Sequence, residues 1–330
     1  MKKIMLISFS LLLIAAVLFS GCLNNDGEEI DLTIGFQPST HQMAYSSAKE
    51  MGWWKSNLTA LESVNSVNDK FFPSGPPEAV ALSSNAIQVA YIGAAPLIPA
   101  IAQNNSQLKI IAAVQTKGSS IVIPTDANYT GPSYFEGKKI ATFPPGSIQD
   151  TLLKQWLVDN GVNLSKVEIK GMDSGEAQTA LKSGAVDAVF LPHPSPTVIV
   201  QGGFGKVAVN SGEMSADHAC CVLAVNQKLI DEHPEIVAKV LEIHIAATEY
   251  TKENPKQAAK YYANVTQVSE DLVLSSINDW DGDWISDPHI IEDYVVAYAK
   301  SQYEQGLVPK LLTTEDLFDM SFYDGYVDGQ

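Results

Sequence analysis

The chain contains two pairs of similar segments, one member of each pair in either half. The segment LSSNAIQVAYIGAAP at 82–96 recurs in altered form as LKSGAVDAVFLPHPS at 181–195. Each segment reads as the end of a helix, a tight turn, a buried strand and a loop containing proline. Asn85 and Gly184 stand at the same place in the two segments, where a left-handed residue ends a helix. The repeat therefore predicts two lobes of similar fold.

A second repeat begins each half. Residues 36–42, FQPSTHQ, match residues 143–149, FPPGSIQ, at the phenylalanine, the second proline, the hydroxyl residue and the glutamine. Each copy follows a short apolar run and precedes an amphipathic helical pattern, with a spacing typical of a capping box. A strand, a turn of small residues and a helix present free backbone N–H groups to an anion. No Walker lysine and no G-x-G-x-x-G pattern accompanies either turn, so we expect a small ligand rather than a nucleotide.

The alternation of strands and helices in both halves predicts an α/β fold with two domains and largely parallel sheets. We expect the chain to cross between them near 110–124 and again near 217–226. The first lobe is then discontinuous, 30–117 and 220–330, and the second lobe is 118–219. Ligands of open α/β sheets lie beyond the carboxyl ends of the strands, so four loops should meet in one cleft between the lobes.

The first 21 residues read as a signal peptide, with Lys2 and Lys3 before an apolar run that is short for a membrane span. The run ends in LFSGC, which resembles a lipobox with Cys22 as the lipidated residue. Residues 22–29 then form a polar linker. We expect an extracytoplasmic protein anchored to the outer face of the cell membrane.

Charge excludes one class of partner. The formal net charge is −17, and all 21 basic residues are lysine. A nucleic-acid-binding face is therefore not expected. Without arginine, no ligand can be held by a bidentate guanidinium group. We expect Lys117 to be a solvated charge in the hinge rather than a ligand contact.

Six segments in order carry a family resemblance: GFQPSTH, FFPSGPPE, AYIGAAP, PPGSIQDTLL, GEAQTALKSGAVDAVF and HPEIVAKVLEIHIAATEYTKENP. The chain resembles the substrate-binding proteins of ABC transporters for nitrate, sulfonates and taurine, which are related to binders of thiamine-pyrimidine precursors. The resemblance implies a type II periplasmic-binding-protein fold of two α/β lobes. It also implies a monomeric receptor that closes on a small molecule and delivers it to the permease and ATPase subunits, without enzymatic activity and without a cofactor.

The resemblance also implies which residues face the ligand. They are Thr40, His41, Ser74, Gly75, Gly93, Ala94, Gln115, Ser119, Gly146, Ser147, Ile148, Gln149, His193, His218 and Cys220. Helix N-termini and small residues favour a small oxyanion such as a sulfonate, taurine or nitrate. The alternative ligand is a neutral heterocycle such as a pyrimidine precursor. The alternative of another class is an enzyme similar to the thiamine-pyrimidine synthases, which share the fold.

Metal binding is not expected from the spacing. His41, His193, His218 and Cys220 are of metal-ligand type, but no pair of them has the spacing of a metal motif. Adjacent residues on a strand point to opposite faces, so we expect no disulfide between Cys220 and Cys221. The acidic segment NDWDGDW at 278–284 lacks the glycine position and the closing glutamate of a calcium loop and reads as a surface turn.

Overall fold

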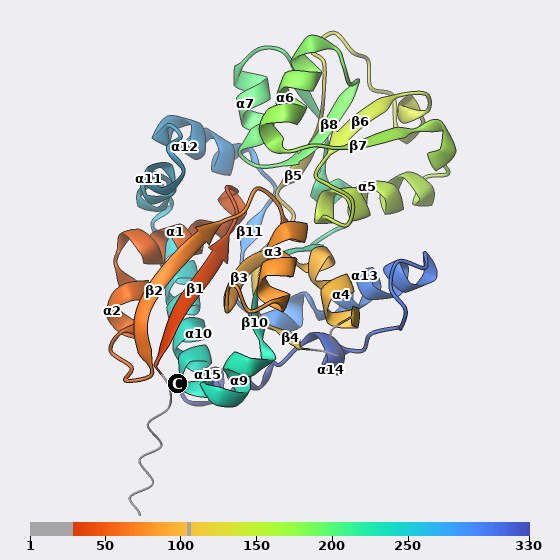
Figure 1. Cartoon of the computed structure of the whole chain (residues 1–330). Coiled ribbons are helices and arrows are strands. Elements are labelled where there is room, and N and C mark those ends of the chain that lie inside the picture. Colours follow the sequence, from red (N-terminus) through yellow and green to blue (C-terminus); the bar gives the residue numbers. More distant parts are fainter. Residues whose placement is uncertain (1–28, 104–106) are drawn as a thin grey trace, which may run out of the picture.

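A computed structural model describes residues 29–103 and 107–330. The predicted signal peptide, Cys22 and nearly all of the predicted polar linker lie outside the described residues. The chain forms two α/β lobes, one above the other in Figure 1, as the sequence predicts. None of the helices in the described ranges is long and apolar enough to cross a membrane.

The first sheet has the strand order β11-β4-β10-β3-β1-β2. Its strands are β1 (Ile30–Phe36), β2 (Val64–Phe71), β3 (Val89–Gly93), β4 (Leu108–Thr116), β10 (Ala219–Asn226) and β11 (Asp283–Trp284). Strand β1 runs parallel to β2 and β3, whereas β10 is antiparallel to β3 and β4. Strands β3 and β10 are buried along their whole length, which explains their unbroken apolar sequences.

The second sheet has the order β7-β6-β8-β5-β9. Its strands are β5 (Ser119–Ile123), β6 (Lys139–Thr142), β7 (Glu168–Gly171), β8 (Ala188–Pro192) and β9 (Lys206–Asn210). Strand β6 is parallel to β7 and β8, and β5 is antiparallel to β8 and β9. The pairing repeats that of β2-β1-β3-β10-β4 strand for strand. The structure thus confirms the two similar lobes.

The expectation of largely parallel sheets is correct for four strands of each lobe, which run in one direction, whereas β11 at the edge of the first sheet runs against them. The strand that enters each lobe from the other, β10 or β5, is antiparallel to both its neighbours. It arrives from the opposite side of the cleft, so it must run against the strands that begin within the lobe.

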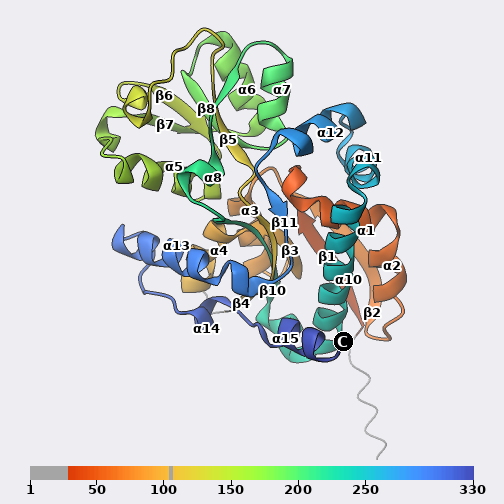
Figure 2. The same cartoon turned by 180° about the vertical axis from the view of Figure 1, so that it is seen from behind.

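Helices cover both faces of each sheet. In the first lobe they are η1 (Thr40–Gln42), α1 (Met43–Glu50), α2 (Trp53–Leu58), α3 (Gly75–Ser83), α4 (Ala94–Gln103), α9 (Gln227–Glu232), α10 (Pro234–Glu253), α11 (Pro255–Thr266), α12 (Glu270–Asp279), η4 (Pro288–Ile290), α13 (Glu292–Glu304), α14 (Thr314–Leu317) and α15 (Ser321–Asp328). In the second lobe they are η2 (Pro132–Phe135), α5 (Ile148–Asp159), η3 (Leu164–Lys166), α6 (Ser174–Ser183), α7 (Ser195–Gln201) and α8 (Ser211–Met214). Helix α10 packs against α1 and α2, and α13 packs against α4 (Figure 2).

The helix ends explain why the two halves of the chain share residues at the matched positions. Asn85 after α3 and Gly184 after α6 have positive φ angles of 59° and 74°, as the aligned segments predict. Ser147 caps α5 by accepting a hydrogen bond from the Asp150 N–H at 3.2 Å. In the other copy Ser39 is the cap, accepting from the His41 N–H at 3.2 Å. Both caps fix the direction in which a helix leaves its strand.

The segment 278–284 is not the surface turn that its composition indicates. Helix α12 contacts α7 of the second lobe, and β11 then pairs with β4 in the first sheet. Between them, the Asp281 carboxylate accepts hydrogen bonds from the N–H groups of Gly118 at 2.9 Å and Gly212 at 2.7 Å. The acidic side chain therefore binds one backbone donor in the first predicted crossing and one shortly before the second. The C-terminal helices are accordingly not confined to the first lobe.

Candidate functional site

The loops that follow β1, β3, β6 and β8 meet between the two sheets. The turn after β1 touches the second lobe directly: the Thr40 N–H and the Ser39 hydroxyl donate to the His193 carbonyl at 3.1 and 3.2 Å. His193 also reaches α12, where its Nδ1 lies 3.0 Å from the Ser276 hydroxyl. These contacts hold the lobes together, so the structure represents a closed arrangement.

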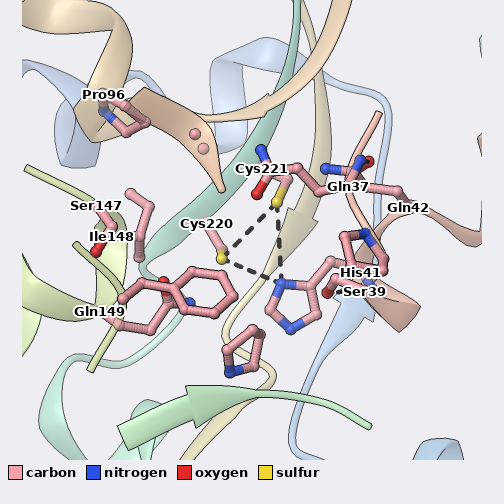
Figure 3. A pocket seen from close by; sticks show the side chains of 15 residues that line it. Gln37, Ser39, His41, Gln42, Pro96, Ser147, Ile148, Gln149, Cys220 and Cys221 are labelled. Carbon is pink, nitrogen blue, oxygen red and sulfur yellow. Dashed lines mark hydrogen bonds between the residues drawn. The ribbon is translucent and has the colours of Figure 1, made fainter. Parts of the chain in front are cut away.

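A small cavity remains where the loops meet (Figure 3). It is lined by Gln37, Pro38, Ser39, His41, Gln42, Gly75, Gly93, Pro96, Phe143, Ser147, Ile148, Gln149, Pro192, Cys220 and Cys221. The space open to the centre of a water molecule is about 20 Å³. A single water needs about 10–15 Å³ on this measure. The closed cavity therefore admits an ion or one or two waters, and a larger organic ligand requires the lobes to move apart.

Seven of the predicted site residues line this cavity: His41, Gly75, Gly93, Ser147, Ile148, Gln149 and Cys220. Eight lie outside its lining: Thr40, Ser74, Ala94, Gln115, Ser119, Gly146, His193 and His218. Thr40 is fully buried, with its hydroxyl oxygen unpartnered and its carbonyl accepting from the Trp284 indole at 2.9 Å. Ser119 contacts a lining residue instead: its hydroxyl accepts a hydrogen bond from the Gln149 side-chain amide at 3.0 Å.

Other residues lining the cavity were not anticipated. Gln42 and Phe143 were visible in the repeat itself, and their place in two copies of one turn was a usable signal. Ser39 has the spacing of a capping box with Gln42, which predicts a helix cap rather than a cavity residue, and nothing in the spacing of Gln37 singles it out. Gln37 donates to the buried Glu78 carboxylate at 2.7 Å. Burial raises the pKa of Glu78 well above its ordinary value, which favours the uncharged form of this acid.

The N-terminus of α5 points into the cavity from the second lobe. Ser147, Ile148 and Gln149 all line it, and the N–H groups of Ile148 and Gln149 make no hydrogen bond to the described part of the chain. Free N–H groups and the positive end of the helix dipole favour an anion here. Asp150, in the same first turn, forms an ion pair with Lys154 at 2.7 Å, which offsets its charge.

No cationic side chain lines the cavity in the described part of the chain. Lys117 instead forms an ion pair with Asp217 at 2.8 Å, across the two crossings, in agreement with a hinge charge. Burial lowers the pKa of His193 to about 3 and that of His218 to about 4. Both imidazoles are therefore neutral at physiological pH and act as hydrogen-bonding groups.

The strand β10 is irregular where it passes the cavity. Ala219 pairs with Thr116 and Cys221 with Gln115, so Cys220 is an extra residue opposite one position of β4. Such a bulge breaks the alternation of side chains along a strand. As a result both thiols turn toward His41, and the assumption that Cys220 and Cys221 must face apart is wrong. Their sulfurs are 3.9 Å apart, and both cysteines are free.

The sequence model of the NMT1-like family matches residues 25–266. A protein of Bacillus subtilis (strain 168) named for aliphatic sulfonate binding is 24% identical over 326 residues, 94% of this chain and 95% of the relative. The taurine-binding periplasmic protein of Escherichia coli (strain K12) is 24% identical over 259 residues, 77% of this chain and 76% of the relative.

Among solved structures, the alkanesulfonate-binding protein SsuA from Xanthomonas axonopodis pv. citri, bound to MOPS, superimposes with a TM-score of 0.75 at 20% identity. The match covers 88% of this chain and 99% of that one. At this identity the likeness establishes the fold, two α/β lobes of the periplasmic-binding type.

Proposed function

The chain belongs to the NMT1-like family, and on that premise we propose that it is the extracytoplasmic solute-binding component of an ABC importer. Its relatives include binding proteins for sulfonates and taurine, which supports a role in binding a small solute. We propose further that the ligand is a small anion of the sulfonate, taurine or nitrate class, captured as the lobes close and passed to the permease.

The observation that supports an anionic ligand is the N-terminus of α5 beside the cavity. Ser147, Ile148 and Gln149 line the cavity between the lobes, and the N–H groups of Ile148 and Gln149 are unpaired within the described part of the chain. Hydrogen bonds to a charged group contribute about 1.5–3 kcal/mol each, enough for recognition without arginine. The neutral heterocycle remains the second candidate, because the lining combines Phe143 and several amides with no cationic side chain.

The test is calorimetric titration of the full-length chain, in mild detergent, with taurine, ethanesulfonate, nitrate and an aminopyrimidine. Ser147→Ala should weaken binding of the anion tenfold or more, by roughly the 1.5–3 kcal/mol of a charged hydrogen bond. It should also lower stability by about 1 kcal/mol, because the helix loses its cap.

Ser269→Ala is the matched control. Ser269 caps α12 through the same bond, accepted from the Leu272 N–H at 3.2 Å, and lies outside the cavity lining. It should lose stability without losing affinity. Unchanged anion affinity in Ser147→Ala would rule out the anion site at α5, and tight binding of the pyrimidine alone would favour the second candidate.

We propose that the receptor is tethered through Cys22, because the apolar run before it is short and a polar linker follows. In the native host, wild type should partition into the detergent phase and Cys22→Ala into the aqueous phase. Equal partitioning of the two into the aqueous phase contradicts the lipid anchor.

A further inference from the structure

Three soft metal-ligand atoms meet at the base of the cavity. His41 comes from the turn after β1, and Cys220 and Cys221 come from the bulge in β10 nearly 180 residues later in the chain. The Nδ1 of His41 and the two Sγ atoms all lie within 4.8 Å of one another (Figure 3). All three side chains are buried, and all three line the cavity.

The separations match the edges of a tetrahedron around one ion. Nδ1 of His41 lies 3.3 Å from Sγ of Cys220 and 3.9 Å from Sγ of Cys221, and the two sulfurs are 3.9 Å apart. Tetrahedral Zn²⁺, with bonds of about 2.3 Å to sulfur and about 2.0–2.1 Å to nitrogen, places two sulfurs about 3.8 Å apart and sulfur and nitrogen about 3.6 Å apart. Shifts of a few tenths of an ångström would therefore complete the site.

The second nitrogen of the imidazole is already held as a metal ligand requires. The Nε2 of His41 lies 2.6 Å from the Gly118 carbonyl oxygen. A carbonyl can only accept, so Nε2 carries the proton and the lone pair of Nδ1 points toward the sulfurs. Donation of the distal N–H to a backbone carbonyl is the usual second-shell arrangement of a metal-bound histidine.

Cysteine binds a metal as the thiolate, so a divalent cation bound here would displace the protons of both thiols to solvent.

We propose that His41, Cys220 and Cys221 bind one Zn²⁺ ion, with a fourth position open to the cavity. Three protein ligands and one exchangeable position are the pattern of zinc sites that take up an exogenous ligand. The cavity of about 20 Å³ leaves room for a water or a small donor group at that position. With two thiolate ligands the zinc site has no net charge, so what the ion would offer a bound solute is the open coordination position; this consequence rests on the proposed function, whereas the site itself does not.

The test uses the full-length chain, purified in mild detergent with a phosphine reductant and stripped with a chelator. Zn²⁺ is titrated against it, and Co²⁺ serves as the spectroscopic probe. We expect one ion per chain, thiolate-to-cobalt charge-transfer absorption and the intense visible bands of tetrahedral Co²⁺. X-ray absorption of the zinc-loaded wild type should report two sulfur neighbours of the zinc. Because this measurement uses the wild type alone, it remains a test of the site even if a variant fails to fold.

Cys220→Ser, Cys221→Ser and His41→Ala should each weaken Zn²⁺ binding by more than the 10–100-fold that loss of an outer-shell partner costs. The control is His289→Ala, since His289 is an exposed histidine outside the cavity and should leave binding unchanged. Melting temperatures identify any variant that fails to fold. Wild type without stoichiometric Zn²⁺, zinc without sulfur neighbours, or a Cys220–Cys221 disulfide that persists in the reduced protein would each overturn the site.

Discussion

Gly118, in the first crossing between the lobes, is constrained by its backbone angle, its hydrogen bonds and its close neighbours. Its φ is +76°, its carbonyl accepts from His41, and its N–H donates to Asp281. A Cβ atom there would lie 2.5 Å from Gln115 Nε2, 2.8 Å from Trp280 Cε3 and 2.9 Å from His41 Nε2. Only glycine adopts this positive φ without strain and also fits the space, because it has no Cβ atom.

Gly118→Ala should therefore lower the free energy of unfolding by about 2–5 kcal/mol, the sum of left-handed strain and overpacking. Gly137→Ala is the control: its φ is +78°, but no atom lies within 4 Å of an added Cβ. It should cost only the backbone strain, about 1–2 kcal/mol. Urea unfolding of both variants checks this, and equal losses would show that the close contacts at Gly118 relax without cost.

At the scale of elements, the repeat carried most of the prediction. Aligned turns indicated the left-handed residues Asn85 and Gly184, the two strand–turn–helix units and the cap at Ser147, and all are present. These features are determined by residues close together in the chain, so the local sequence pattern is enough to predict them.

The Cys220 bulge and the role of Asp281 could not be foreseen in the same way. Each is determined by pairing between segments far apart in the chain, with β4 in one case and with Gly118 and Gly212 in the other. For the same reason, the cluster of His41 with two thiols has no spacing motif. Metal-binding motifs are recognised by the local spacing of their ligands, so a set of ligands that folding brings together from distant segments has no such motif.

Helix α10 carries a buried histidine that links it to the first sheet. His244 Nε2 donates to the Ala113 carbonyl at 2.7 Å, and its Nδ1 accepts from the Tyr91 hydroxyl at 2.9 Å. Burial lowers the pKa of His244 to about 4 from an ordinary value of 6.5. Between these values the unfolded chain binds a proton that the folded chain does not, so stability must fall as pH falls.

We expect wild type to lose about 2–3 kcal/mol of stability through this group between pH 7 and pH 4.5, at about 1.4 kcal/mol per pH unit. His244→Gln should be less stable than wild type at pH 7, because its geometry cannot reproduce both bonds. The difference between the two should shrink as pH falls. Urea unfolding at several pH values measures it, and a difference that stays constant would show that His244 titrates normally in the fold.

At the scale of the whole molecule, the closed arrangement rests on a few polar contacts. The His193 carbonyl accepts from Ser39 and Thr40, and its ring meets Ser276. Individually such bonds contribute about 0.5–1.5 kcal/mol, so a bound ligand can decide the balance between open and closed lobes.

Small-angle scattering should therefore give a larger radius of gyration without ligand than with it. The probe is whichever of taurine, ethanesulfonate and nitrate binds in the calorimeter, at saturating concentration. The ligand-bound curve should approach that of the closed structure, with the lobes apart only by the space that the ligand needs. A radius that does not change on saturation would count against closure by hinge motion.

The order β11-β4-β10 places the chain's passages between the lobes next to one another in the first sheet. Strands β4 and β10 lead into and out of the second lobe, and β11 follows the helix that touches it. Because these connections lie side by side, bending the lobes about the line through them strains each connection only a little. Twisting the lobes about the long axis of the molecule would instead shear the hydrogen bonds between the paired strands. We therefore expect any motion that preserves the sheet to be a single bending of one lobe toward the other, without rotation of the two walls of the cavity past each other.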